Sequence, residues 1–149
     1  MEKMQIIVSD FDSYKPPFSL WSIFYVQCGE ACFPEHEHWD LTTTLLEMWL
    51  DNMCGLLFGV STQCTLPFMN GDYSIQLILS GIHSIKVIWM KNKKAKGVFD
   101  EIDLLYFVRQ LLSAASLALN HVQKEGDKLT SQNIPGRIAA LRKAYHQIK

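Results

Sequence analysis

Three apolar runs with turn residues between them restrict what this chain can fold into. The runs are residues 64–69, 73–80 and 83–90. Asn70-Gly71 follows the first run and favours a tight turn, because both residues tolerate positive φ. In the second and third runs apolar side chains recur at alternate positions, as they do along a strand with one face on a core. The sequence therefore predicts an antiparallel meander over residues 64–90.

Other runs complete an α+β pattern. Residues 4–9 and 20–28 are rich in β-branched and aromatic side chains, which predicts two more strands. Apolar residues at spacings of three and four predict three helices. These helices are expected at about residues 41–58, 100–125 and 134–148. We expect one α+β domain spanning residues 1–149, with an antiparallel sheet of about five strands and the three helices packed on it.

Polar and proline residues mark the expected helix starts. Asp40 and Asp100 stand where an N-cap is favoured, close before apolar residues with helical spacing. Pro135 is expected in the first turn of the last helix, where its missing N–H has no helical partner to lose. Residues 97–99 are expected to form a short final strand before the second helix.

The net charge of −1 hides an uneven distribution of charged residues along the chain. Residues 1–83 hold ten acidic and two basic side chains, whereas residues 84–149 hold five acidic and twelve basic ones. Such an asymmetry is typical of chains with an interaction surface. The alternative is that the two halves interleave in space and neutralise each other.

Acidic residues crowd one segment, which is a candidate docking surface for a basic protein. The candidate partner-binding residues are Glu30, Glu35, Glu37, Trp39, Asp40, Glu47 and Asp51. Complementary charge raises association rates and excludes wrong partners. Trp39 either anchors an interface or packs as the apolar residue that often precedes an N-cap. A merely solvated acidic face remains the alternative for the whole segment.

The same part of the chain holds four side chains that zinc prefers as ligands. They are Cys28, Cys32, His36 and His38. Zinc in structural sites takes four nitrogen or sulfur ligands in a tetrahedron. The spacing departs from the usual one, because a single residue separates the two histidines where three to five are typical. We expect no metal and no other cofactor, and keep zinc binding at these four residues as the lesser alternative.

The sequence lacks motifs for catalysis, nucleic-acid binding and membrane insertion. It has no nucleophile elbow, no phosphate-binding glycine loop and no zinc-protease motif. The lysines within residues 86–96 form a short basic turn, which is a small footprint for nucleic acid. No run approaches the ~20 apolar residues that span a bilayer. We expect a protein that is not an enzyme and that binds neither nucleic acid nor membrane.

Two stretches resemble small bacterial immunity proteins, which are encoded beside polymorphic or contact-dependent growth inhibition toxins. They are Phe33-Pro34…Trp39-Asp40…Leu45-Leu46…Trp49 and Leu66…Phe68-Met69-Asn70-Gly71-Asp72-Tyr73-Ser74-Ile75. The resemblance covers roughly residues 20–80. It implies a cytoplasmic, non-catalytic protein that binds the C-terminal domain of a cognate toxin and blocks its active site or its access to substrate. The resemblance transfers no binding residue, so the acidic segment is a physical inference.

The expected function is therefore neutralisation of a basic toxin domain, such as a nuclease, by a tight complex. Four cysteines without an export signal also favour a cytoplasmic location. The alternative is a structural or regulatory subunit of a larger assembly, or a homodimer. This alternative is favoured by Ile78, Ile88 and Met90, which put apolar side chains on the second face of the meander.

Overall fold

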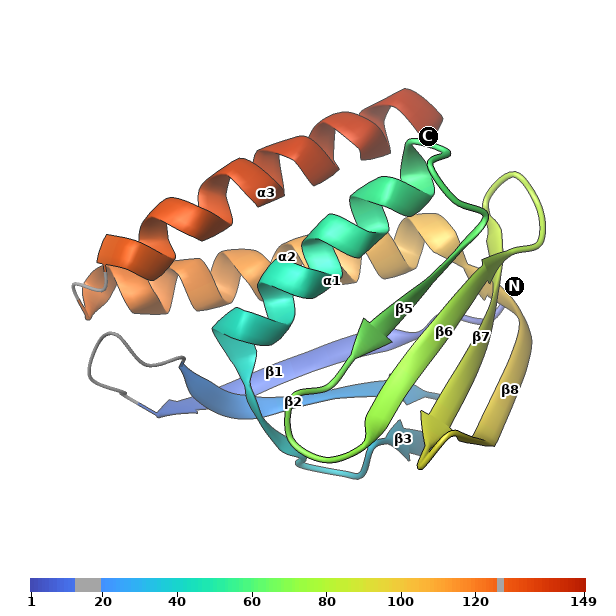
Figure 1. The fold of residues 1–149 in the computed structure, drawn as a ribbon, viewed down its shortest axis with the longest axis horizontal. Coiled ribbons are helices and arrows are strands. Elements are labelled where there is room, and N and C mark those ends of the chain that lie inside the picture. Colours follow the sequence, from blue (N-terminus) through green and yellow to red (C-terminus); the bar gives the residue numbers. More distant parts are fainter. Residues whose placement is uncertain (13–19, 126–127) are drawn as a thin grey trace.

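The computed structural model describes residues 1–12, 20–125 and 128–149. These residues form eight strands in two antiparallel sheets, together with three helices. The helices lie together on one side of both sheets (Figure 1). The α+β prediction is confirmed, although the strands number eight in two sheets rather than about five in one sheet.

The first sheet is built around its central strand β2. Its strands are β1 (Gln5–Asp12), β2 (Trp21–Cys28), β3 (Ala31–Phe33) and β4 (Trp39–Leu41). β1 pairs along one side of β2, while β3 and β4 pair with opposite ends of its other side. Ile23 to Val26 are all buried, so β2 is covered on both faces. A strand covered on both faces has a continuous apolar run instead of an alternating one.

The second sheet contains the predicted meander and one more strand. Its strands, in spatial and sequence order, are β5 (Gln63–Pro67), β6 (Tyr73–Leu79), β7 (Ser84–Lys91) and β8 (Lys94–Asp103). Asn92 and Lys93 join β7 to β8 with φ angles of 51° and 64°. Positive φ at both positions is the geometry of the tightest hairpin turns.

The N-terminal residues join the two sheets. Glu2 N donates a hydrogen bond of 3.1 Å to the carbonyl of Glu101, and Asp103 N donates one of 2.8 Å to the carbonyl of Glu2. Glu2 thereby forms a parallel bridge with Ile102 in β8, three residues before β1 begins in the other sheet.

The three helices form two layers above the sheets. They are α1 (Thr42–Leu57), α2 (Leu104–Lys124) and α3 (Lys128–Ile148). α1 packs on β5 of the second sheet, α2 packs on β1 of the first, and α3 packs across α1 and α2 (Figure 1). One connected core of buried apolar side chains lies between them. Edge-to-face contacts of Trp49 with Phe24 (5.1 Å between ring centroids) and Phe68 (5.3 Å) tie α1 to both sheets.

Two predicted helix starts are wrong, for different reasons. The strand β8 extends to Asp103, so α2 begins at Leu104 and its N-cap is Asp103, which accepts a bond of 3.0 Å from Tyr106 N. α3 begins at Lys128, which places Pro135 inside the helix. Proline removes one helical hydrogen bond there. Ile134 and Ile138 on either side of it are buried in the core, and this packing keeps the helix continuous.

Candidate functional site

Asp40 occupies a buried position between the two sheets, and the prediction that it caps the first helix is wrong. The residue at the N-cap of α1 is Leu41, which has no side chain able to cap. The exposed fraction of Asp40 is 0%. A carboxylate without exposed surface cannot contact a partner, so Asp40 is not part of a docking surface in this structure.

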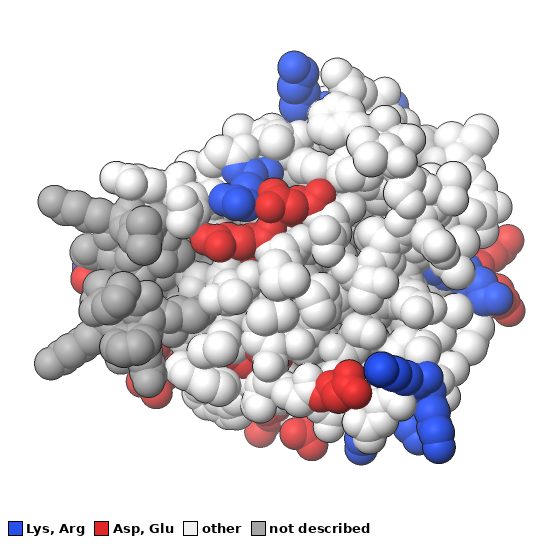
Figure 2. All heavy atoms as spheres, viewed as in Figure 1, with Lys and Arg blue, Asp and Glu red and all other residues white. Residues whose placement is uncertain are grey.

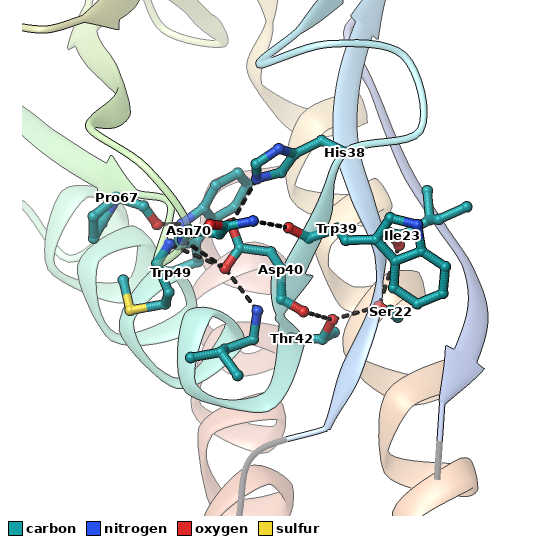
Figure 3. Close-up of polar contacts among 11 residues, drawn as sticks. Ser22, Ile23, His38, Trp39, Asp40, Thr42, Trp49, Pro67 and Asn70 are labelled. Atoms are coloured by element: carbon teal, nitrogen blue, oxygen red, sulfur yellow. Dashed lines mark hydrogen bonds and ion pairs between the residues drawn. The ribbon is translucent and has the colours of Figure 1, made fainter. Parts of the chain in front are cut away.

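The Asp40 carboxylate accepts hydrogen bonds from backbone groups of two distant segments (Figure 3). Its Oδ1 lies 2.7 Å from the N of Leu41, 3.1 Å from the N of Met69 and 3.2 Å from the N of Asn70. Its Oδ2 lies 2.9 Å from Nε2 of His38, which is also buried. We call these contacts the Asp40 network. It binds the start of α1 to the turn between β5 and β6.

Further polar contacts surround the Asp40 network. Asn70 Nδ2 donates to the carbonyl of Trp39 (2.9 Å), and Trp49 Nε1 donates to the carbonyl of Pro67 (2.6 Å). The hydroxyls of Ser22 and Thr42 also form a hydrogen bond with each other. Each contact links β4 or α1 to a neighbouring strand or turn, so this corner of the fold is fixed from several directions (Figure 3).

The pairing of His38 with Asp40 resembles an acid–base dyad but cannot act as one here. A general base must come within hydrogen-bonding distance of its substrate. The exposed fractions of His38 and Asp40 are 4% and 0%, and His38 is enclosed by the rings of Phe68 and Tyr73. The dyad therefore has a structural role.

Three of the four cysteines, Cys28, Cys54 and Cys64, are poorly suited to nucleophilic chemistry. Burial raises the pKa of Cys28 to about 11, and the hydrogen bond and charge of Glu2 add to this effect. Burial alone raises the pKa of Cys64 to about 11, and burial with the charge of Asp51 raises the pKa of Cys54. The thiolate is the reactive form of cysteine. These three side chains therefore remain protonated thiols at neutral pH.

Three predicted acidic residues lie on the surface beside β2. Glu30 is in the turn between β2 and β3, and Glu35 and Glu37 are in the loop between β3 and β4. All three are exposed, and the described part of the chain offers none of them an ion-pair partner. We call Glu30, Glu35 and Glu37 the acidic rim. The span of β2 beside it, from residue 23 to residue 28, is about 17 Å long.

Trp39 stands at one end of the acidic rim. It pairs with Ile23 of β2 and is 40% exposed, while its neighbour Asp40 is buried, because successive side chains of a strand point to opposite faces. Figure 3 shows the Trp39 ring on the side of β4 away from Asn70. The loop carrying Glu35 and Glu37 also packs on β2, since the rings of His36 and Tyr25 are 5.6 Å apart.

Glu47 and Asp51 lie on α1, apart from the loop that carries Glu35 and Glu37. Asp51 is paired with Arg137 of α3 at 3.1 Å, and Glu47 is half-buried. Figure 2 shows charged side chains in small separate groups on a mostly uncharged face. The acidic segment of the sequence thus divides into the acidic rim, the buried Asp40 and the two acids of α1.

The four possible zinc ligands are not brought together. Cys28 donates its thiol proton to Glu2 (3.2 Å), His38 pairs with Asp40, and His36 packs on Tyr25. Within residues 1–12, 20–125 and 128–149, no group of three or more histidine, cysteine or acidic side chains is placed to hold a metal ion.

No family model, curated protein or solved structure matches this chain. Within the described residues, no helix combines the length and the apolar character that a membrane crossing requires.

Sequence reasoning missed the part that Asn70 plays. The Asn-Gly pair indicated a turn, and the turn is present, but its backbone N–H groups point to Asp40 rather than to a second strand. The available signal was an acidic residue followed by Thr42 and Thr43, both buried. An aspartate directly before a helix also fits an exposed cap, so the pattern did not distinguish the two arrangements.

Replacing Asp40 tests the Asp40 network. Asp40→Asn keeps the size of the side chain and an oxygen for the backbone N–H groups, but it replaces the oxygen that faces His38 Nε2 by an NH2 group, which cannot accept a hydrogen bond. We expect the free energy of unfolding to fall by about 2 kcal/mol or more, since one acceptor is lost and the remaining hydrogen bonds no longer go to a charged group. Urea denaturation measures the change.

Asp51→Asn is the matched control for this substitution. It removes an exposed ion pair, which should change the free energy of unfolding by less than about 1 kcal/mol. Equal effects of the two substitutions would contradict the structural role of Asp40.

Alkylation rates test the state of the thiols. A pKa of about 11 for Cys28 and Cys64, against an ordinary value of 9.0, leaves roughly 100-fold less thiolate at neutral pH. We expect iodoacetamide to label both residues ~100-fold more slowly in the native protein than in urea, as read by peptide mass spectrometry. Glu2→Gln removes a charge that opposes ionisation of Cys28, so labelling of Cys28 should accelerate while Cys64 stays unchanged. Native labelling at the denatured rate would refute the assignment.

Proposed function

We propose that this chain is a non-catalytic binding protein that neutralises a cognate basic toxin domain by covering it with the acidic rim. The observation that carries this proposal is the exposure of Glu30, Glu35 and Glu37 without an ion-pair partner in the described residues. Carboxylates left unpaired on a surface create a negative potential, which attracts a basic partner and speeds encounter. Trp39 would add an apolar anchor, because tryptophan is enriched among residues that dominate interfaces.

The attachment of the rim supports a binding role. The strands next to the acidic rim, β3 and β4, pair with opposite ends of the same side of β2. The Asp40 network fixes the chain directly after Trp39. A surface that is ordered before binding loses less conformational entropy in the complex than a flexible one. The acidic rim consists of exposed carboxylates, and the buried pair of His38 and Asp40 is closed to a substrate, so binding rather than chemistry is the proposed activity.

A nuclease domain is the partner chemistry that this surface fits best. Enzymes that act on nucleic acids carry Lys and Arg to contact phosphates. Carboxylates held at fixed positions would occupy such a basic cleft in place of phosphates. The proposed site of action is the cytoplasm, where a delivered nuclease would reach nucleic acid.

A growth test in a bacterial host examines the proposal. The C-terminal domain of whatever large protein is encoded immediately upstream is induced alone or together with this chain. We expect toxicity from the domain alone and normal growth when both are produced. A toxic domain that remains equally toxic in the presence of this chain would contradict the proposal.

Charge reversal examines the proposed surface separately from the proposed role. In the rescue assay and in binding kinetics with the purified domain, Glu35→Lys combined with Glu37→Lys should slow association ~10-fold or more at low salt, and the difference should shrink at high salt. Glu125→Lys at the C-terminal end of α2 is the control, since it changes an exposed acid elsewhere. Rescue that survives the double reversal with unchanged kinetics would retain the role and reject the acidic rim.

A further inference from the structure

The two edges of the second sheet differ in how their backbone groups are satisfied. At the β5 edge, the carbonyl of Thr65 accepts from Asn52 Nδ2 (2.8 Å) and that of Pro67 from Trp49 Nε1 (2.6 Å). Side chains of α1 therefore cover β5. At the β8 edge, Glu2 bonds only near the C-terminal end, at Glu101 and Asp103.

The remainder of the β8 edge is open. In the part of the chain that the structure describes, residues 94–100 form no backbone hydrogen bonds outside their ladder with β7. An unpaired strand edge is a template for another strand. β8 is thus the place in this sheet where a further strand can add.

The charges along β8 are arranged so that the strand is complementary to itself. Lys96, Val98 and Asp100 are exposed and alternate with the half-buried Gly97 and Phe99, which pair with the buried Trp89 and Val87, so the three side chains lie on the outer face of the sheet. The ladder with β7 is irregular at Lys96 and at Asp100, so these two residues have no partner in β7. When two copies of β8 pair antiparallel about a two-fold axis at Val98, Lys96 of each copy stands opposite Asp100 of the other. Val98, which is 52% exposed, then meets its own counterpart.

A hollow beside the β8 edge can accommodate Lys96 of the second copy and has carboxylates in its lining. It has a volume of about 630 Å³ and is lined by Met1, Glu2, Val98, Phe99, Asp100 and Glu101. Its three carboxylates, like Lys94 and Lys96 at the other end of the strand, have no ion-pair partner among the described residues. Opposite charges that remain unpaired within one copy can therefore be paired between two copies.

Two apolar side chains of β7 lie beside Val98 on the outer face of the sheet. Val98 pairs with Ile88, and Met90 lies on the same face of β7. Both are half-buried, and the residues opposite them in β6 are Gln76 and Ser74. A second sheet joined at β8 would place this small apolar group next to its own counterpart at the two-fold axis.

We propose that the chain forms a symmetric homodimer through antiparallel pairing of β8 with β8 of a second copy. The pairing joins two four-stranded sheets into one continuous sheet. Each interface contains two Lys96–Asp100 pairs and a central Val98 pair, because a two-fold axis repeats every contact. Lysines on an edge strand often prevent such association. In β8 the same strand also carries Asp100, which can form an ion pair with Lys96 of the other copy. The proposal concerns a different sheet from the acidic rim and does not depend on toxin binding.

Sedimentation velocity of the full chain, from low micromolar to several hundred micromolar protein, tests the dimer. We expect a concentration-dependent equilibrium between the chain mass of 17.1 kDa and twice that mass. Dimerisation should weaken at high salt, since exposed charge pairs are screened. A monomer at every concentration would overturn the proposal and would indicate that Lys94 and Lys96 prevent edge-to-edge association.

Charge exchange identifies the interface. Lys96→Glu and Asp100→Lys should each weaken dimerisation ~10-fold or more, because each replaces two opposite-charge pairs with two like-charge pairs. The double variant Lys96→Glu/Asp100→Lys should restore it. Lys124→Glu at the end of α2 is the control, and circular dichroism checks that all variants fold. A dimer that tolerates both single variants, or that the double variant fails to restore, would overturn the β8 interface.

Discussion

The hydrogen bonds of the buried Asp40 carboxylate are the interaction on which the rest of the structure depends. A buried charge costs several kcal/mol unless hydrogen bonds replace its water. Asp40 meets this requirement with the N–H groups of Leu41, Met69 and Asn70 and with His38. Because these donors come from segments about thirty residues apart in sequence, the carboxylate is satisfied only when the start of α1 and the turn between β5 and β6 meet.

The position of Asp40 couples the core to the surface. Two residues later the chain enters α1, whose Trp49 packs against Phe24 and Phe68 and thereby joins the sheets. One residue earlier it presents Trp39 to solvent. Both proposed binding surfaces consist of charges that find no counterpart within the described chain, one at the acidic rim of the first sheet and one at the β8 edge of the second. Asp51 and Arg137 pair an acidic residue of the first half of the sequence with a basic residue of the second half.

The sequence predicted the elements whose periodicity reflects a buried face. The meander and the three helices were found because Leu46, Trp49 and similar residues recur with the spacing of a core-facing surface. β8 was found only in part, because charged residues flank its short apolar stretch and most of its length has no apolar alternation. The role of Asp40 could not be predicted, since an aspartate before a helix is the usual sign of an exposed N-cap. What decides its burial is a turn thirty residues away, and local sequence carries no record of that contact.

Amide hydrogen exchange at Met69 and Asn70 tests the role of Asp40 most directly. Both residues lie in the turn between β5 and β6, outside the strand ladders, and their N–H groups bond to the Asp40 carboxylate. If the carboxylate holds this turn, the two amides should exchange as slowly as those of the core strands, because they open only when the fold opens. Exchange at the rate of an unstructured loop would show that the Asp40 carboxylate does not hold the turn between β5 and β6.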